Sequence, residues 1–316
     1  MVIIFQKIKN TLEKEFSSLN LVCQEHYCLR MWRISKKEKY LKPVIKREKQ
    51  VLKKWLENCQ QLDNKNYQKD FALKLLNNFK IDKNERKKKQ KEFYLKNPQY
   101  KFLTNFIWQT HKLKDFNLNN KYKNQFLKSL LFFNNQSVRK IYLSSDYLKA
   151  DPSESVNSIC FLKNLKVVDL SGELKNMLEK NYYPLNKLKE YQYYLWLYSL
   201  THIIIAASNY YQQFVSSEKY QWILRYFKDN FETIVKKATP DIIAEIGICC
   251  KLTRSNKNLI EKTKQLVISS FDPEKGYIPR KDMQTLNDIE HRNTLAIMLF
   301  SDFDKLYKGP DLSEYF

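Results

Sequence analysis

Glycine is almost absent from this chain of 316 residues. Four glycines occur, at positions 172, 247, 276 and 309, so the first 171 residues contain none. Sandwiches and barrels need turn residues at short intervals, because tight hairpins use backbone conformations that glycine adopts best. The eight prolines are scattered singly, and 43% of the residues are hydrophobic, which is enough for a sizeable core. The sequence therefore predicts an all-α fold.

Proline marks several of the expected helix starts. Pro43, Pro98, Pro184 and Pro240 each open a segment of helical composition, where a missing backbone N–H costs nothing. The expected helices cover residues 43–60, 67–80, 83–97, 99–113, 184–213, 217–238, 240–253, 256–270 and 287–306. The segment IYLSSDYL, residues 141–148, favours a short extended piece instead. Short connections between the helices predict antiparallel hairpins.

Polar residues interrupt the apolar helices at a nearly regular interval. His202, Glu245 and His291 are separated by 43 and 46 residues, and His111 lies 91 residues before His202. A period of about 45 residues is the length of two packed helices with their loops. We therefore expect an α/α toroid or a toroid-like array of antiparallel helical hairpins, with these residues on its inner face.

Three segments of the C-terminal half carry a resemblance. LTHIIIAAS, PDIIAEIGICCKL and IEHRNTLAIM together resemble a bacterial helical family of unknown function. The resemblance implies a helical toroid and no activity. The arrangement is also similar to α/α-toroid enzymes, including glycan-cleaving enzymes and lanthionine-forming cyclases. The zinc-binding cysteine and histidine pattern of those cyclases is not found here.

Four residues conflict with their local surroundings. His202 and Glu245 interrupt apolar helices, and a buried polar group needs hydrogen-bond partners. His291 and Arg292 follow the start of the last helix, where the helix dipole disfavours cations. We therefore expect a neutral His291, and an acidic partner or an anionic ligand for Arg292.

Neighbouring acids have simpler explanations. Asp288 complements the positive end of the last helix, and Asn287 with Glu290 fits a variant of the capping box. Asp241 likewise suits a first helical turn, although it shares one helix face with Glu245.

Three interpretations remain open for His202, Glu245, His291 and Arg292. They could form a polar network that fixes helix packing. They could line a pocket for a small anionic or peptidic ligand, with Glu245 or His202 as general base. Two histidines and a carboxylate could also bind a metal, but no local motif such as H-E-x-x-H supports this, so we predict no metal ligand. Our candidate catalytic residues are His202, Glu245 and His291, and our candidate ligand-binding residues are Arg292, Asp241, Asn209, Ser199 and His111.

Positive charge is concentrated in the N-terminal half. Residues 1–150 hold 34 Lys and Arg against 13 Asp and Glu, whereas residues 151–316 hold 22 against 21. Within residues 36–97, which include KNERKKKQKE, the numbers are 20 and 8. Such a run forms a solvated face or a binding surface. A binding surface of this kind would take an anionic membrane, or nucleic acid without sequence preference. We divide the chain into a basic helical region, 1–97, and a helical-hairpin domain, 98–316, which could also be continuous.

Other features bound location and chemistry. Six cysteines without a C-x-x-C pair predict reduced thiols and a cytoplasmic location, and the apolar run in MVIIFQKIKN is too short for a signal peptide. Residues 191–217 carry no charge and predict a buried helix, with a membrane span as the alternative. The sequence has no glycine-rich phosphate loop and no G-x-S-x-G elbow, which disfavours P-loop and serine chemistry. It identifies no cofactor and leaves open whether the protein is an enzyme.

Overall fold

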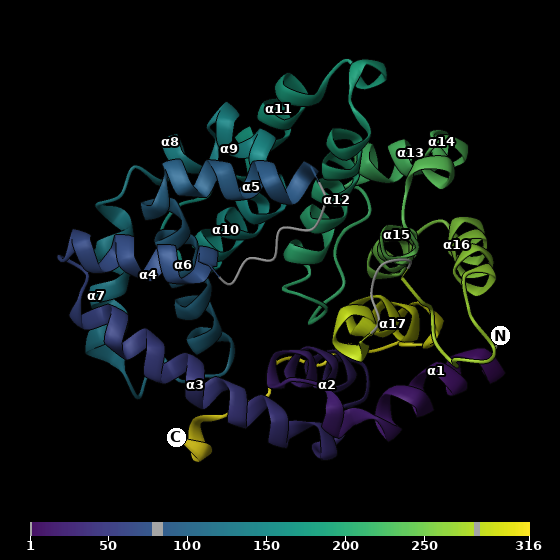
Figure 1. Cartoon of the computed structure of the whole chain (residues 1–316), viewed down its shortest axis with the longest axis horizontal. Coiled ribbons are helices and arrows are strands. Elements are labelled where there is room, and N and C mark those ends of the chain that lie inside the picture. Colours follow the sequence, from purple (N-terminus) through teal and green to yellow (C-terminus); the bar gives the residue numbers. More distant parts are fainter. Residues whose placement is uncertain (1, 78–84, 281–284) are drawn as a thin grey trace. The chain divides into compact units, whose positions relative to one another are not determined.

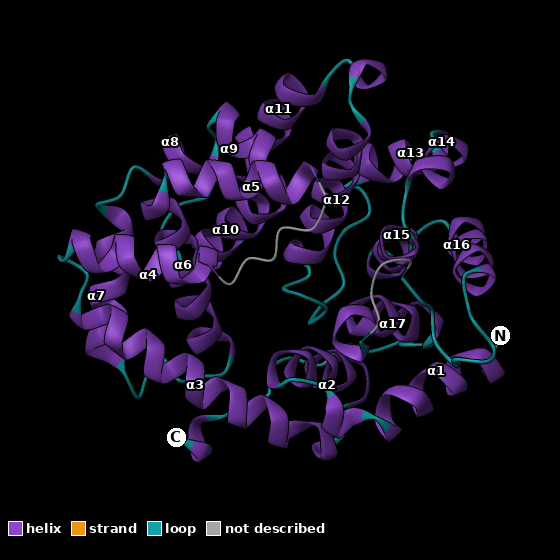
Figure 2. Cartoon of the chain, viewed as in Figure 1, coloured by secondary structure: helices purple, strands orange, loops and turns teal. Residues whose placement is uncertain are grey.

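The computed structural model describes residues 2–77, 85–280 and 285–316. Within these residues the chain forms 17 α-helices joined by short 3-10 helices and loops (Figures 1 and 2). The same residues contain no β-strand, only an isolated antiparallel bridge between Asp272 and Tyr277. The prediction of an all-α fold is confirmed.

Contacts divide the chain into two compact units. Unit 1 consists of Met1–Glu48 and Ala207–Pro310, and unit 2 of Lys49–Ala206 and Asp311–Phe316. The division at residue 97, which we based on charge, stays a prediction. The toroid also stays a prediction, because it concerns how the hairpins of both units surround one axis.

Unit 1 is built around its last helix. Its helices are α1 (Val2–Lys14), α2 (Leu21–Ser35), α13 (Gln221–Asp229), α14 (Phe231–Lys237), α15 (Pro240–Leu252), α16 (Lys257–Ser269) and α17 (Leu286–Phe300). Helix α17 packs against α1, α2 and α15, and α15 packs closely on α16 (Figure 1). Gly247 permits this approach, because a Cβ atom there would overlap the side chains of Thr263 and Leu299.

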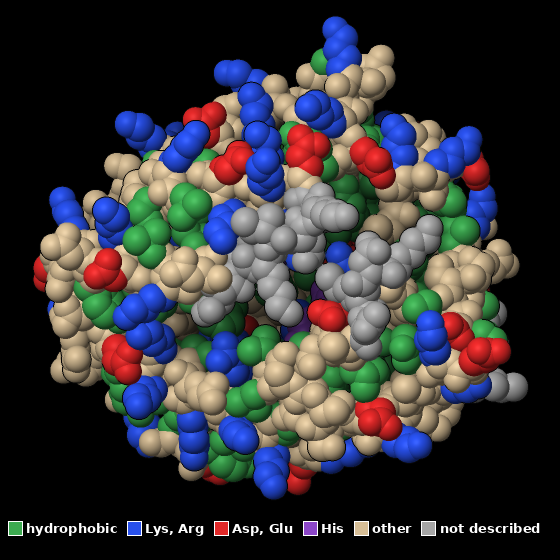
Figure 3. Space-filling view, in the orientation of Figure 1, with side chains coloured by type: hydrophobic (Ala, Val, Ile, Leu, Met, Phe, Trp, Pro, Cys, Tyr) green, Lys and Arg blue, Asp and Glu red, His purple; other side chains and the backbone are tan. Residues whose placement is uncertain are grey.

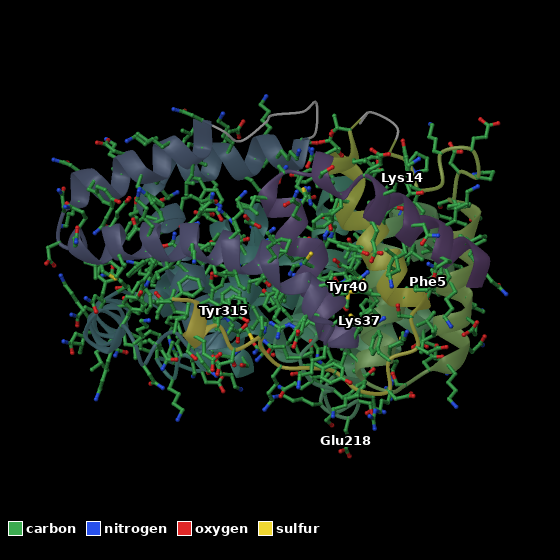
Figure 4. All side chains as sticks on the ribbon, turned by 90° about the horizontal axis from the view of Figure 1, so that it is seen from below. Phe5, Lys14, Lys37, Tyr40, Glu218 and Tyr315 are labelled. Atoms are coloured by element: carbon green, nitrogen blue, oxygen red, sulfur yellow. The ribbon has the colours of Figure 1, made fainter. Side chains whose placement is uncertain are left out.

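A partly buried carboxylate fastens α1 to the rest of unit 1. Glu13 accepts hydrogen bonds from the hydroxyl of Tyr27 on α2, at 3.1 Å, and from that of Tyr40, at 2.9 Å. Tyr40 ends the 3-10 helix Glu38–Tyr40 and is labelled in Figure 4. These bonds outweigh the cost of burial and hold the pKa of Glu13 below its ordinary value. Helix α2 is thereby held in a defined position beside α17.

Unit 2 is built around α6. Its helices are α4 (Lys65–Asn77), α5 (Glu85–Lys96), α6 (Pro98–Asp115), α7 (Lys123–Asn134), α8 (Val138–Tyr142), α9 (Ser145–Ala150), α10 (Pro152–Asn164), α11 (Ser171–Tyr182), nearly all of α12 (Glu190–Ala207) and most of α3 (Leu41–Gln60). Helix α6 packs against α4, α5, α7 and α10. The indole of Trp55 on α3 donates to the Thr110 hydroxyl on α6 at 2.9 Å, which satisfies its only polar atom within the core.

Most of the expected helices are confirmed, with local differences. Residues 217–238 form two helices, α13 and α14, and residues 184–213 form a 3-10 helix followed by the shorter α12. Residues 78–84, which include one end of two expected helices, lie outside the described residues. The extended piece expected at 141–148 is wrong. Helix α8 ends there at Tyr142, and Ser144 caps the start of α9, accepting from the Tyr147 amide at 3.2 Å.

A membrane span at 191–217 finds no support. Of the helices in the described ranges, none has the length and the apolar composition that a membrane crossing requires. Helix α12 ends at Ala207, and Asn209, Tyr210 and Tyr211 follow with positive φ angles of 51°, 55° and 71°. The helix that we expected over residues 184–213 would have placed Asn209 on the same helix as Ser199 and His202. That placement is wrong, because the chain leaves the helix before Asn209.

Candidate functional site

Helix α17 brings four ionisable side chains of unit 1 together. Glu290 and His291 begin its second turn, His26 lies on α2, and Glu245 lies on α15. We call Glu290, His26, His291 and Glu245 the relay cluster. Glu245 is held among isoleucines by a helix that is buried along most of its length. The packing of α17 between α2 and α15 thus explains why residues so far apart in sequence meet.

The contacts of the relay cluster form a chain. Nδ1 of His26 lies 2.8 Å from Oε1 of Glu290, and Nε2 of His26 lies 3.3 Å from Nδ1 of His291. The two rings are 5.1 Å apart between centroids. Nε2 of His291 lies 3.8 Å from Oε1 of Glu245, which is too long for a direct hydrogen bond.

The position of each proton follows from these contacts. An ionised Glu290 can only accept, so Nδ1 of His26 carries a proton. In a neutral His26 the other nitrogen then accepts, and the proton between the rings belongs to Nδ1 of His291. Nε2 of His291 is left with a lone pair. With His26 neutral, the contacts therefore fix one tautomer at each ring and leave a base at the end of the cluster.

Burial and charge shift two of the pKa values. Desolvation by the surrounding protein atoms lowers the pKa of His291 to about 4, although 44% of its side chain is accessible. The positive charge that His26 carries once it is protonated, and that of Arg30, lower it further, and Asp241 and Glu290 oppose this. Burial alone would raise the pKa of Glu290, but His26 and a 2.6 Å hydrogen bond from the Thr294 hydroxyl hold it below its ordinary value. At neutral pH His291 is thus uncharged and Glu290 is ionised, as the proton positions require.

Exposure differs sharply within the relay cluster. The side chains of Glu290 and Glu245 are 3% and 2% exposed, and that of His26 is 20% exposed. The side chain of His291 is 44% exposed. The chain of contacts therefore runs from a buried carboxylate to an imidazole that a dissolved molecule can reach.

Arg292 has acceptors within unit 1. Its Nη2 donates to Oδ1 of Asp241 at 3.0 Å, and its Nη1 donates to the carbonyl oxygen of Pro279 at 2.7 Å. Burial opposes ionisation of Asp241, but Arg292 and His291 keep the pKa of Asp241 below its ordinary value. The acidic partner that the sequence demanded for Arg292 is therefore Asp241, one helical turn before Glu245.

The remaining candidates lie elsewhere. His202, Ser199 and His111 belong to unit 2, whereas Glu245, His291, Arg292, Asp241 and Asn209 belong to unit 1. Nδ1 of His202 lies 2.9 Å from Oδ1 of Asn157, and the Asn164 amide lies 3.2 Å from Nε2 of His111. Both asparagines are on α10. The buried Ser199 hydroxyl donates to the Trp196 carbonyl inside its own helix.

Sequence reasoning missed His26 and misjudged Glu290. Oδ1 of Asn287 accepts from the backbone amide of Asn20 at 2.7 Å, and Thr285 precedes the helix, with its hydroxyl donating to Asp288. The capping box that we expected for Glu290 is therefore wrong. His26 lies 85 residues before His111, close to the intervals that separate the other histidines. That interval was the signal that could have identified it.

The described residues show no metal-binding cluster, and a pocket of the chain lies away from the relay cluster. Over the described ranges, no group of three or more His, Cys, Asp or Glu side chains is arranged to hold a metal ion. A pocket of about 830 Å³ lies between α13 and the start of α16, lined by cations such as Arg225 and acids such as Glu218. It shares no residue with the relay cluster and none with our candidates.

The basic stretch lies on α3, α4 and α5 and the loops beside them. Lysines such as Lys53, Lys88 and Lys89 are exposed, and Lys89 pairs with Glu92 at 3.3 Å. On the face drawn in Figure 3, Lys and Arg side chains are widely spread, with Asp and Glu side chains among them. Binding of nucleic acid or of an anionic membrane through residues 36–97 stays a prediction.

Comparison with known proteins gives one match. A family model described as "Domain of unknown function (DUF3541)" matches residues 1–315. The chain belongs to this family. No curated protein and no solved structure matches it. The DUF3541 model covers both units, so the relay cluster lies within the family's domain. A family of unknown function is also what the three segments of the C-terminal half resemble.

Proposed function

We propose that the relay cluster binds a small anionic or peptidic ligand and exchanges a proton with it at Nε2 of His291. The observation that supports this is the exposure of the final ring, 44% for His291 against 3% for Glu290. A network that only holds helices together gains nothing from ending on an accessible base. A proton-transfer site requires this arrangement.

Each member of the relay cluster has a role in this proposal. Glu290 holds the ring of His26 in one tautomer, and His26 holds the ring of His291 in turn. Glu245 acts from the other side. The 3.8 Å between its carboxylate and Nε2 of His291 allows a ligand O–H or N–H to contact both acceptors. A hydroxyl or a peptide nitrogen fits this position because it donates.

Positive charge beside the cluster favours a negative charge on the ligand. Arg30 is close enough to His291 to lower its pKa, and Arg292, which follows His291 in sequence, pairs with Asp241 at 3.0 Å. Within the described residues, the Nε atoms of both arginines are buried without a hydrogen-bond acceptor. A carboxylate or phosphate is the group that guanidinium binds best.

Ring-nitrogen NMR tests the proposal, since the chain has only four histidines. The protein labelled with ¹⁵N at histidine is titrated with glycylglycine, which carries a carboxylate and N–H donors, and separately with inorganic phosphate. We expect the resonances of His291 and His26 to shift together and saturably with at least one probe. His111 and His202 should not shift, because their partners lie on α10.

Two variants complete the experiment. His291→Asn should abolish the saturable shift of His26, whereas His202→Asn, in unit 2, should leave it intact. Equal shifts at all four histidines, or shifts that persist in His291→Asn, would contradict the proposal.

A cytoplasmic location accompanies this function as part of the proposal. All six cysteines are free thiols, and burial raises the pKa of Cys59 to about 11 and that of Cys250 to about 12. Such thiols are poor nucleophiles and suit a reducing compartment.

A further inference from the structure

Helix α7 of unit 2 exposes an apolar stripe. Leu127 and Leu131 are 47% and 64% exposed, which places both among the exposed large hydrophobic side chains of the chain. They are four residues apart and therefore lie on one side of the helix. Ser129 and Phe133, on the opposite side, are buried and anchor α7 to its unit. The exposed leucines thus do not arise from a displaced helix.

The charge around this stripe has one sign. Residues 116–145 contain five Lys and Arg and no Asp or Glu. Lys121, Lys123 and Lys128 are exposed, and Lys123 precedes Leu127 by one turn on the same side. Arg139 is the member of the five that pairs with an acid, Glu173, at 2.8 Å. The leucine stripe is therefore bordered by lysines without an acid in the same segment.

We propose that α7 docks on an anionic lipid surface, with Leu127 and Leu131 in the acyl–headgroup boundary and the lysines among the headgroups. Amphipathic helices with lysines beside an apolar face bind membranes in this way. Each lysine near such a surface adds an electrostatic contribution that salt weakens. This surface shares no residue with the relay cluster or with the basic stretch 36–97, although it borders that stretch where Lys128 donates to the Cys59 carbonyl at 3.1 Å. The variants below separate the two surfaces.

Other occupants fit the stripe less well. Nucleic acid attracts lysine through its phosphates but offers nothing that requires two exposed leucines. A second copy docked through the same stripe would oppose two lysine-bordered surfaces, and like charges facing each other are unfavourable. A lipid surface satisfies both the apolar and the cationic residues.

Vesicle sedimentation of the full chain tests the proposal. We expect binding to vesicles of three parts phosphatidylcholine and one part phosphatidylserine, and far weaker binding to pure phosphatidylcholine. The double variant Leu127→Asn/Leu131→Asn should bind about tenfold more weakly or worse. The charge variant Lys121→Glu/Lys123→Glu should also lose binding, and raised salt should weaken the wild type.

Matched controls locate the effect. Leu95→Asn changes an equally exposed leucine, 48%, on the lysine-rich α5, and should bind like the wild type. Circular dichroism verifies that each variant is folded, which is expected because the substituted side chains are exposed. Wild type that ignores anionic vesicles at low salt overturns the proposal. Unchanged binding by the leucine variant also overturns it. A third contrary result is a wild type that dimerises without binding lipid and a leucine variant that is monomeric.

Discussion

Replacing Glu290 by glutamine tests whether this buried carboxylate organises the relay cluster. The carboxylate accepts two hydrogen bonds, at 2.8 Å from His26 and 2.6 Å from Thr294. A hydrogen bond to a charged group contributes about 1.5–3 kcal/mol. Both donors contact Oε1, so the amide oxygen of glutamine can still accept from both, but without the negative charge. Two charge-assisted hydrogen bonds become neutral ones, and each loses about 1 kcal/mol. We expect Glu290→Gln to lower the free energy of unfolding by about 2 kcal/mol.

Urea denaturation followed by far-ultraviolet circular dichroism measures this loss. Glu261→Gln is the matched control, because Glu261 belongs to the same unit, is 50% exposed and pairs with Lys264 at 2.9 Å. An exposed pair contributes about 0.5 kcal/mol or less. A Glu290→Gln variant as stable as Glu261→Gln would refute the argument that the carboxylate holds His26 in place.

Three further predictions concern packing and protonation. Gly247→Ala should lower the free energy of unfolding by about 1–3 kcal/mol, because the added Cβ overlaps Thr263. Gly172→Ala should raise it by about 0.5–1 kcal/mol, because no atom lies within 4 Å of the added Cβ. Melting temperatures that shift in the same direction for both variants would refute this. The free energy of unfolding should fall by about 1 kcal/mol as pH drops from about 6.5 to 4, after allowing for the partly exposed ring of His291. The pKa of His291 is lower in the folded protein than in the unfolded chain, so the unfolded chain binds more protons over this range. His291→Asn should flatten this part of a pH–denaturation curve. Diethyl pyrocarbonate modifies only the neutral imidazole ring, and peptide mass spectrometry measures the rate at each histidine. Carbethoxylation of His291 should be equally fast at pH 7 and pH 5.5, whereas that of an ordinary imidazole slows about eightfold. An eightfold slowing at His291 would show that its pKa is ordinary.

The helices were predictable because local chemistry determines them. The absence of glycine before position 172 removes most tight hairpins, and Pro98 and Pro240 occupy the first turn of α6 and α15. Errors arose where a short segment has two local options. Tyrosine and isoleucine in residues 141–148 favour extended chain, but the Ser144 cap commits the segment to helix. Asn209 tolerates the left-handed conformation and ends α12 early.

The site was predictable only in part. The conflict of His291 and Arg292 with the dipole of α17 was visible in sequence, and so was the isolation of Glu245 in an apolar helix. The partner of Glu290 was not visible in sequence, because a glutamate at this position suits a capping box as well as a buried ion pair. Only the packing of α2 on α17 shows that His26 faces it.

The pKa and tautomer of His291 test the central claim most directly. Ring-nitrogen NMR over about pH 4 to 8 separates the four histidines and reports which nitrogen of each carries the proton. The account predicts a His291 protonated at Nδ1 alone at neutral pH, titrating near its lowered pKa of about 4. A His291 that titrates near 6.5, or one whose proton lies on Nε2, would contradict it.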